Sequence, residues 1–122
     1  MRDDALKPVE WMGSSLKDLI DFPRDARRDV GHALDEVQRG GVPDSAKAMK
    51  GFGGASVMEI VEDHRGDTYR AVYTVRFDEV VYVLHCFQKK SKRGIATPKS
   101  DIDLIQSRLK MAREHHEARP KP

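Results

Sequence analysis

The 122-residue chain has a mass of 13.8 kDa, the size of a single folded domain. Its 22 Lys and Arg residues nearly balance its 20 Asp and Glu residues, and 39% of the residues are hydrophobic, so the composition excludes wholesale disorder. No apolar run approaches the ~20 residues of a membrane-spanning helix, and residues 1–4 lack the apolar stretch of a signal peptide. One cysteine, Cys86, excludes an internal disulfide and a Cys-based zinc knot. We expect one cytoplasmic domain over residues 1–122, with no membrane contact.

A short strand and two helices are predicted first along the chain. Residues 9–12 alternate weakly in polarity and predict the strand. A cap at Ser14 or Ser15 opens a short helix, which Pro23 interrupts before starting a second helix as its first residue. Apolar residues then recur with helical periodicity at Ala26, Val30, Ala33, Leu34 and Val37. These elements predict a helical hairpin packed on one side of a sheet.

Three strands are predicted in the middle of the chain, after a glycine-rich loop over residues 40–54. Residues 56–62 and 68–77 alternate in polarity, as half-buried strands do. Residues 80–87 are apolar on both faces, as an interior strand is. The short connections between these segments predict an antiparallel meander.

A C-terminal helix is predicted to follow Thr97 as its cap and Pro98 as its first residue. Its buried stripe is Ile102, Ile105, Leu109 and Ala112. The polar tail, residues 114–122, is expected to fray. The element order predicts an α+β fold in which a mainly antiparallel sheet of about four strands carries the helical hairpin and a C-terminal helix.

The charge is distributed unevenly along the chain. Residues 1–84 have a balance of −4, whereas residues 85–122 have a balance of +6. Residues 87–100 have no acidic residue and contain the cations Lys89, Lys90, Lys92, Arg93 and Lys99. A basic cluster beside an aromatic ring, here Phe87, is typical of proteins that bind phosphate backbones, but it is also typical of a solvated loop.

Further basic residues are predicted near the same edge of the sheet. Arg70 lies on the strand next to the apolar one, and Lys50 precedes a glycine turn, residues 51–54, whose amides are suited to a phosphate. Arginine and lysine without metal ligands suit RNA cleavage by the ribose 2′-OH, because the RNA supplies its own nucleophile. The protein then needs a base, cations and a proton donor, but no metal or other cofactor.

Four other positions are considered for a functional role, and two of them have two interpretations. His85 is either a packed, hydrogen-bonded histidine or a proton donor beside the strand-end lysine. Glu59 either orients Arg70 or faces water. Cys86 is interpreted as a small buried hydrophobe, and the adjacent histidines at 115–116 lack the spacing of metal ligands on a helix.

The chain resembles the RelE/ParE toxin superfamily over residues 9–109, and most nearly its HigB-like, phage-derived branch. The segments that carry the resemblance are Met49-Lys50-Gly51, Met58-Glu59-Ile60, Tyr69-Arg70-Ala71-Val72-Tyr73, Val83 to Lys90, and Thr97-Pro98. The resemblance implies a toxin of a type II toxin–antitoxin pair, many of which cleave messenger RNA at the ribosome. It also implies an antitoxin with a helix-turn-helix domain, through which alone the pair would contact operator DNA.

The resemblance also implies roles for individual residues. Arg70 matches the strand arginine that stabilises transition-state charge, and Lys89 and Lys90 match the basic pair at the end of the last strand. The chain departs from RelE itself, which has lysines where Glu59 and Glu62 stand here and a tyrosine in its C-terminal segment.

The general base is left open between Lys89 and His85. The predicted catalytic residues are Arg70, His85, Lys89 and Lys90, and the predicted RNA-binding residues are Lys50, Phe87, Lys92, Arg93 and Lys99, with no metal. We expect Arg70 to project into solvent with the two lysines, so that replacing it would leave folding intact.

Three functions compete at this point. The first is a ribosome-dependent endoribonuclease held silent by its antitoxin. The second is a ParE-like gyrase inhibitor without catalytic activity, and the third is a non-toxic RNA-binding regulatory module. The strand-end cations and Arg70 favour the nuclease, because ParE-like proteins lack that cluster.

Overall fold

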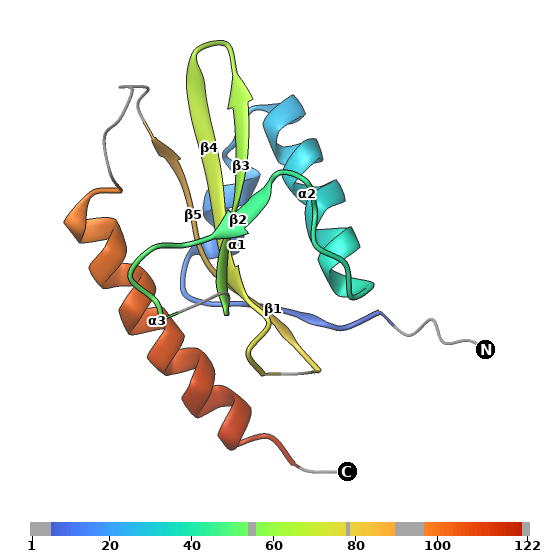
Figure 1. Ribbon diagram of the computed structural model, residues 1–122, viewed down its shortest axis with the longest axis vertical. Helices are drawn as coiled ribbons and strands as arrows, with labels where there is room; N and C mark the ends of the chain where they lie inside the picture. The colour runs from blue at the N-terminus through green and yellow to red at the C-terminus, as the bar shows by residue number, and fades with distance from the viewer. Residues whose placement is uncertain (1–5, 54–55, 78, 90–96, 121–122) are drawn as a thin grey trace.

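The computed structural model describes residues 6–53, 56–77, 79–89 and 97–120. The elements in chain order are β1 (Val9–Trp11), α1 (Ser15–Ile20), α2 (Arg24–Gln38), β2 (Ala46–Ala48), β3 (Val57–His64), β4 (Asp67–Thr74), β5 (Val81–Lys89) and α3 (Lys99–Glu117), as Figure 1 shows. They form a five-stranded sheet in the order β1-β5-β4-β3-β2. Strand β1 is parallel to β5 and the other pairs are antiparallel, so the predicted α+β class and the meander β3-β4-β5 are confirmed.

Strand β2 lies within residues 40–54, where the sequence pattern predicts only a loop. It pairs antiparallel with β3, with Ala46 opposite Ile60 and Ala48 opposite Met58. Three residues are too few to produce a readable alternation, so the strand exists through its pairing with β3 rather than through its own pattern. The pairing also places Lys47 opposite Glu59.

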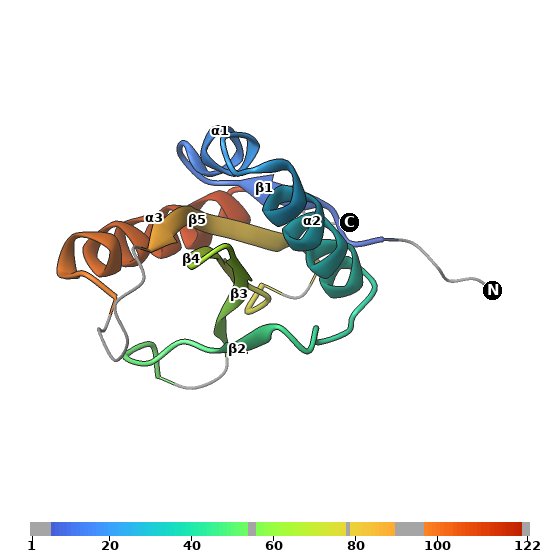
Figure 2. The same ribbon diagram turned by 90° about the horizontal axis from the view of Figure 1, so that it is seen from above.

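Helices α1 and α2 cover one face of the sheet, as Figure 2 shows from above. The α2 stripe predicted from periodicity is fully buried. It packs with Leu19 and Phe22 against sheet residues that include Ile60, Tyr73 and Cys86. Burial raises the pKa of the Cys86 thiol to about 12, so this residue is the inert buried group that the sequence predicted.

Helix α3 packs on the opposite face of the sheet. The core there contains Ile105 and Ala112 of α3 with sheet residues such as Val72, Tyr82 and Leu84. Within the described residues, no helix combines the length and the apolar character that crossing a membrane requires.

The two long helices differ from the prediction at their ends. Pro23 and Pro98 each lie one residue before the helix, as caps rather than first residues, which is within the usual uncertainty of helix boundaries. Helix α3 continues to Glu117 although the segment from residue 114 was expected to fray. The reason is a pair of tertiary contacts that polarity does not reveal: the His115 Nδ1 lies 2.9 Å from the Tyr82 hydroxyl, and the His116 ring stacks on Phe77 with centroids 5.1 Å apart.

A bulge interrupts the pairing of β4 with β5. Tyr73 lies opposite Val83 but Val72 lies opposite His85, so Leu84 is the extra residue. The Leu84 carbonyl oxygen accepts a hydrogen bond of 3.0 Å from Arg108 of α3. The bulge moves His85 onto the face of the sheet that α3 covers.

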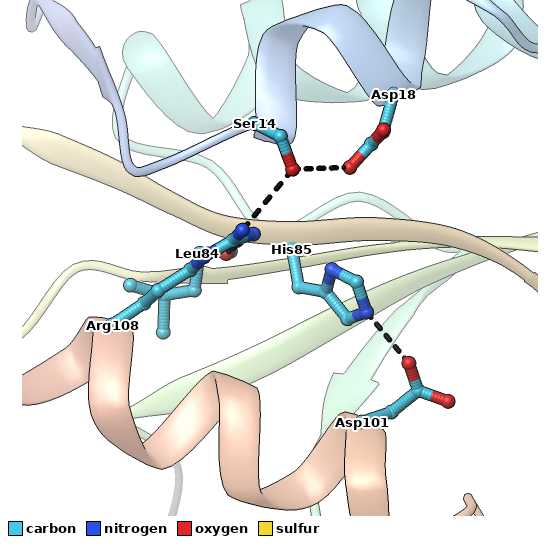
Figure 3. A network of polar contacts seen from close by, with 6 residues as sticks. All are labelled: Ser14, Asp18, Leu84, His85, Asp101 and Arg108. Atoms are coloured by element: carbon cyan, nitrogen blue, oxygen red, sulfur yellow. Dashed lines mark hydrogen bonds and ion pairs between the residues drawn. The ribbon is translucent and has the colours of Figure 1, made fainter.

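The Arg108 guanidinium also ties α3 to the start of α1. It donates to Ser14 Oγ at 3.1 Å, and Ser14 donates in turn to Asp18 at 2.7 Å (Figure 3). The guanidinium lies directly over Gly13, whose φ is +55°, and a Cβ at this position would come within 2.6 Å of Arg108 Nε. Glycine at residue 13 therefore suits both this backbone conformation and the close approach of Arg108.

Candidate active site

Strand register brings several predicted site residues to the α3 face of the sheet. Val72, in the α3 core, has Glu59 opposite it on β3 and His85 opposite it on β5. Arg70 lies opposite Phe87, two residues along the same strands, so alternation places it on the same face. Thr68 lies opposite Lys89 one step further on. Sheet geometry therefore gathers Arg70, His85, Phe87 and Lys89, whereas Lys90, Lys92 and Arg93 lie outside the described residues.

Arg70 is paired with a carboxylate rather than exposed to solvent. Its Nη1 donates to Glu59 Oε1, and the two side chains are only 14% and 6% exposed. The expectation that Arg70 projects into solvent is wrong, because the neighbouring strand supplies a counter-charge on the same face. Of the two readings of Glu59, the one in which it orients Arg70 is confirmed. Arg70 Nε is buried and has no hydrogen-bond partner within the described ranges, so the guanidinium keeps a donor unused.

Lys89 ends strand β5 close to this ion pair. Burial lowers the pKa of Lys89 below its ordinary value, and the positive charge of Arg70 lowers it further. The negative charge of Glu59 acts in the opposite direction, and Lys47 of β2 adds a smaller lowering. A lysine with a lowered pKa is a stronger acid at neutral pH than an ordinary lysine.

Lys47 was not predicted as a site residue, because it lies on the strand that the sequence did not reveal. Its register position opposite Glu59 places it on the same face as Arg70 and Lys89. We call Lys47, Glu59, Arg70 and Lys89 the Arg70 cluster.

His85 is held by hydrogen bonding and stacking. Its Nε2 lies 2.8 Å from Asp101 Oδ1 in the first turn of α3 (Figure 3), and its ring stacks on Phe87 with centroids 4.7 Å apart. The side chain is 8% exposed, and Nδ1 is buried with no partner among the residues that the structure describes. This geometry matches the packed, hydrogen-bonded reading of His85. Asp101 was missed because a contact across 16 residues of chain leaves no local signal.

The remaining predicted residues, Lys50 and Lys99, are exposed. Lys50 lies in the turn after β2, next to Gly51, whose φ is +89°. Lys99 begins α3 and pairs with Asp103 four residues later at 2.8 Å. Within the described part of the chain, neither lysine forms a hydrogen bond or an ion pair with Arg70 or Glu59. Both are therefore peripheral to the Arg70 cluster.

The Arg70 cluster contains the groups that are needed to cleave a phosphodiester bond by transesterification. A carboxylate can accept a proton, a guanidinium can bind two phosphate oxygens, and an ammonium of lowered pKa can donate a proton. All of them project from a rigid sheet, which limits the reorganisation needed when charge develops.

The family model of the Phage derived protein Gp49-like (DUF891) family matches residues 17–110. The matched segment runs from α1 into α3 and includes the whole Arg70 cluster together with His85 and Asp101. No curated protein matches the chain. Because the match spans most of its length, the chain belongs to the Gp49-like family of phage-derived proteins, a family associated with RelE-like toxins of toxin–antitoxin systems.

Proposed function

We propose that the protein is the toxin of a type II toxin–antitoxin system, related to RelE and HigB, and that it cleaves messenger RNA. The observation that carries the proposal is the buried ion pair between Glu59 and Arg70, which lies beside Lys89. Burying two charges costs several kcal/mol per ion before their attraction is counted, so such a pair is a candidate functional site when it lies among further ionisable groups. Family membership supports the same function.

The reaction is attack of a ribose 2′-oxygen on the adjacent phosphorus. A phosphate group of the RNA first replaces Glu59 as a hydrogen-bond acceptor of the Arg70 guanidinium. Glu59 then accepts the proton of the 2′-OH. Arg70 donates to the phosphate oxygens and stabilises the charge that develops on them. Lys89 donates a proton to the departing 5′-oxygen. The products are a 2′,3′-cyclic phosphate and a 5′-hydroxyl, and no metal or cofactor takes part.

His85 and Phe87 support this chemistry from the next strand. Asp101 holds His85 Nε2, and Nδ1 is buried, so we assign His85 to positioning rather than to proton transfer. The half-buried Phe87 ring lies opposite Arg70 and offers a face for stacking of an RNA base. Lys90, predicted as catalytic, and Lys92 and Arg93, predicted to bind RNA, lie outside the described residues and stay predictions.

The proposal includes the partners expected of such a toxin. These are a cognate antitoxin with a helix-turn-helix domain, the ribosome with its messenger RNA, and operator DNA contacted through the antitoxin alone. The site of action is the cytoplasm. A cationic active surface is most readily neutralised by an acidic or sterically blocking antitoxin segment.

The test is induced expression of the chain without its antitoxin, followed by mapping of messenger RNA ends. The wild type should produce new ends inside translated regions, and Lys89→Ala should lower cleavage by about 10²–10⁴-fold because the proton donor is lost. Lys110→Ala is the matched control, since Lys110 is an exposed lysine of α3 outside the Arg70 cluster. Purified protein incubated with free RNA and with translating ribosomes shows whether the ribosome is required.

Two outcomes would contradict the proposal. Unchanged transcripts together with blocked DNA supercoiling would establish a gyrase inhibitor. RNA binding without cleavage or growth arrest would establish a regulatory module.

A further inference from the structure

We propose that Asp29, Glu62 and His64 form a binding site for a divalent transition-metal ion, with Zn²⁺ as the best-suited ion. The site joins helix α2 to strand β3 on the face of the sheet opposite the Arg70 cluster. It is independent of the proposed RNA chemistry.

Two rigid elements position the three side chains. Glu62 and His64 are two residues apart on β3 and therefore point to the same face. Glu62 lies opposite Tyr69, a residue of the core beneath α1 and α2, so this face is the one that α2 covers. Asp29 faces them from α2, with its Oδ2 3.3 Å from His64 Nε2. One potential ligand atom from each residue lies within 4.8 Å of the other two.

These separations are close to those of a metal site. Tetrahedral zinc with bonds of about 2.0–2.1 Å places its ligand atoms about 3.3 Å apart, the distance that the Asp29 and His64 atoms already have. The third atom, on Glu62, has to approach by at most about 1.5 Å, which rotation of a carboxylate side chain can supply. A water molecule would occupy the fourth position.

The charges at the site also favour a cation. Two carboxylates face one imidazole, and the half-buried Glu62 side chain has no hydrogen bond or ion pair to another residue in the described ranges. Arg28 approaches the other oxygen of Asp29, with its Nε 3.6 Å from Oδ1, and leaves Oδ2 directed at His64. A divalent ion between the two carboxylates would replace like-charge repulsion with attraction.

The histidine is held in place before any ion binds. Its ring meets Tyr69 edge-on with centroids 6.3 Å apart, and Tyr69 packs on Phe22. The tight turn that follows, with φ of 52° at Arg65 and 88° at Gly66, fixes the end of β3. A site that needs little ordering binds more tightly than one assembled by its metal.

The donor set selects the ion. One imidazole nitrogen with two carboxylates suits Zn²⁺ and its neighbours in the first transition row, whereas Mg²⁺ and Ca²⁺ prefer oxygen ligands alone. Because the site bridges α2 and the β3-β4 hairpin, the bound ion is expected to stabilise the fold rather than to touch the RNA.

The experiment is calorimetric titration of the metal-free full chain with ZnCl₂ and, separately, with MgCl₂, followed by thermal melts. Zn²⁺ should bind at one ion per chain and raise the melting temperature, and Mg²⁺ should do neither. Glu62→Gln and His64→Ala should each weaken Zn²⁺ binding by about tenfold or more. His32→Ala is the matched control, because His32 is an exposed histidine of α2 outside the site, and it should keep wild-type affinity.

Glu62→Gln keeps the test decisive if His64→Ala fails to fold, since Glu62 has no partner to lose among the described residues. Absence of saturable Zn²⁺ binding by the wild type overturns the proposal. Wild-type affinity in Glu62→Gln, or an equal loss in His32→Ala, overturns it as well. RNA cleavage that is unchanged by a chelator separates this site from the proposed active site.

Discussion

The two faces of the sheet differ in the kinds of residue that they bury. The face under α1 and α2 is closed by apolar residues such as Val30 and Ile60, both fully buried. The face under α3 buries Glu59, His85 and Arg108 in addition to its apolar residues. A fold of this size gains little stability from buried charges, since an apolar replacement is often neutral or stabilising. The ionisable groups on the α2 face, Asp29, Glu62 and His64, are only partly buried, so that face keeps its apolar core, whereas the face under α3 gives up part of its stability to bury ionisable groups in fixed positions.

Replacing Arg70 should have the largest effect, because it changes both the cleavage rate and the stability of the fold. Arg70→Ala removes the cation that stabilises transition-state charge, which should lower the cleavage rate by about 10²–10³-fold. It also leaves the Glu59 carboxylate buried without its partner, which should destabilise the fold by about 3–5 kcal/mol. Cleavage assays and urea unfolding measure the two effects. Because Arg70 is buried rather than exposed, we no longer expect its replacement to leave folding intact.

The controls for this prediction distinguish the loss of stability, caused by an unpaired buried charge, from the loss of cleavage. Arg113→Ala removes an exposed arginine of α3 and should change stability by no more than about 0.5 kcal/mol. The double variant Glu59→Gln with Arg70→Ala should recover stability without recovering cleavage. Wild-type cleavage by Arg70→Ala would place the active site elsewhere.

A substitution on the apolar face should reduce stability alone. Ile60 is the residue after Glu59 on β3, but it points into the core under α2 and is fully buried. Ile60→Ala should cost about 2–5 kcal/mol through lost burial and the cavity left behind. The cleavage rate per folded molecule should stay at the wild-type value, and Ile20→Ala, at a half-exposed residue of α1, should change neither property. A large fall in rate for Ile60→Ala would mean that the two faces are not separate.

Local patterns predicted the apolar face more completely than the polar one. The α2 stripe and the three long strands follow from periodicities of 3.6 and 2 residues, which are visible in the sequence. The face under α3 depends on contacts between residues that are distant in the sequence. The pairing of β2 with β3 places Lys47, and the bulge at Leu84 turns His85 toward α3. The partners Glu59 and Asp101 likewise lie 11 and 16 residues from Arg70 and His85. The sequence thus drew attention to Arg70 and Lys89 but did not reveal Lys47 or Asp101, and it left the role of Glu59 open.

The contact between His85 and Asp101 gives a smaller effect with a matched control on the same helix. Asp101→Ala removes the partner of a nearly buried histidine nitrogen and should destabilise the fold by about 1.5–3 kcal/mol. Asp103→Ala breaks only the exposed pair with Lys99 and should cost about 0–1 kcal/mol. Urea unfolding measures both, and amide exchange should rise in the first turns of α3 only for Asp101→Ala. Equal effects of the two substitutions would mean that Asp101 does not hold α3 on the sheet.

The smallest expected effect is a shift in the pH profile of cleavage caused by Lys47. Burial and the charge of Arg70 lower the pKa of Lys89, and Lys47 lowers it further, so the Lys89 ammonium loses its proton at a lower pH than an ordinary lysine. If that ammonium is the proton donor, cleavage falls as the pH rises through this pKa. Lys47→Ala removes one of the lowering charges, so the pKa of Lys89 should rise and the alkaline limb should move to higher pH. Lys50→Ala, at an exposed lysine just beyond the same strand, should leave the limb in place. A limb that is unmoved by Lys47→Ala, or that moves to lower pH, would remove Lys89 from the proton-donor role and leave Arg70 and Glu59 to be tested without it.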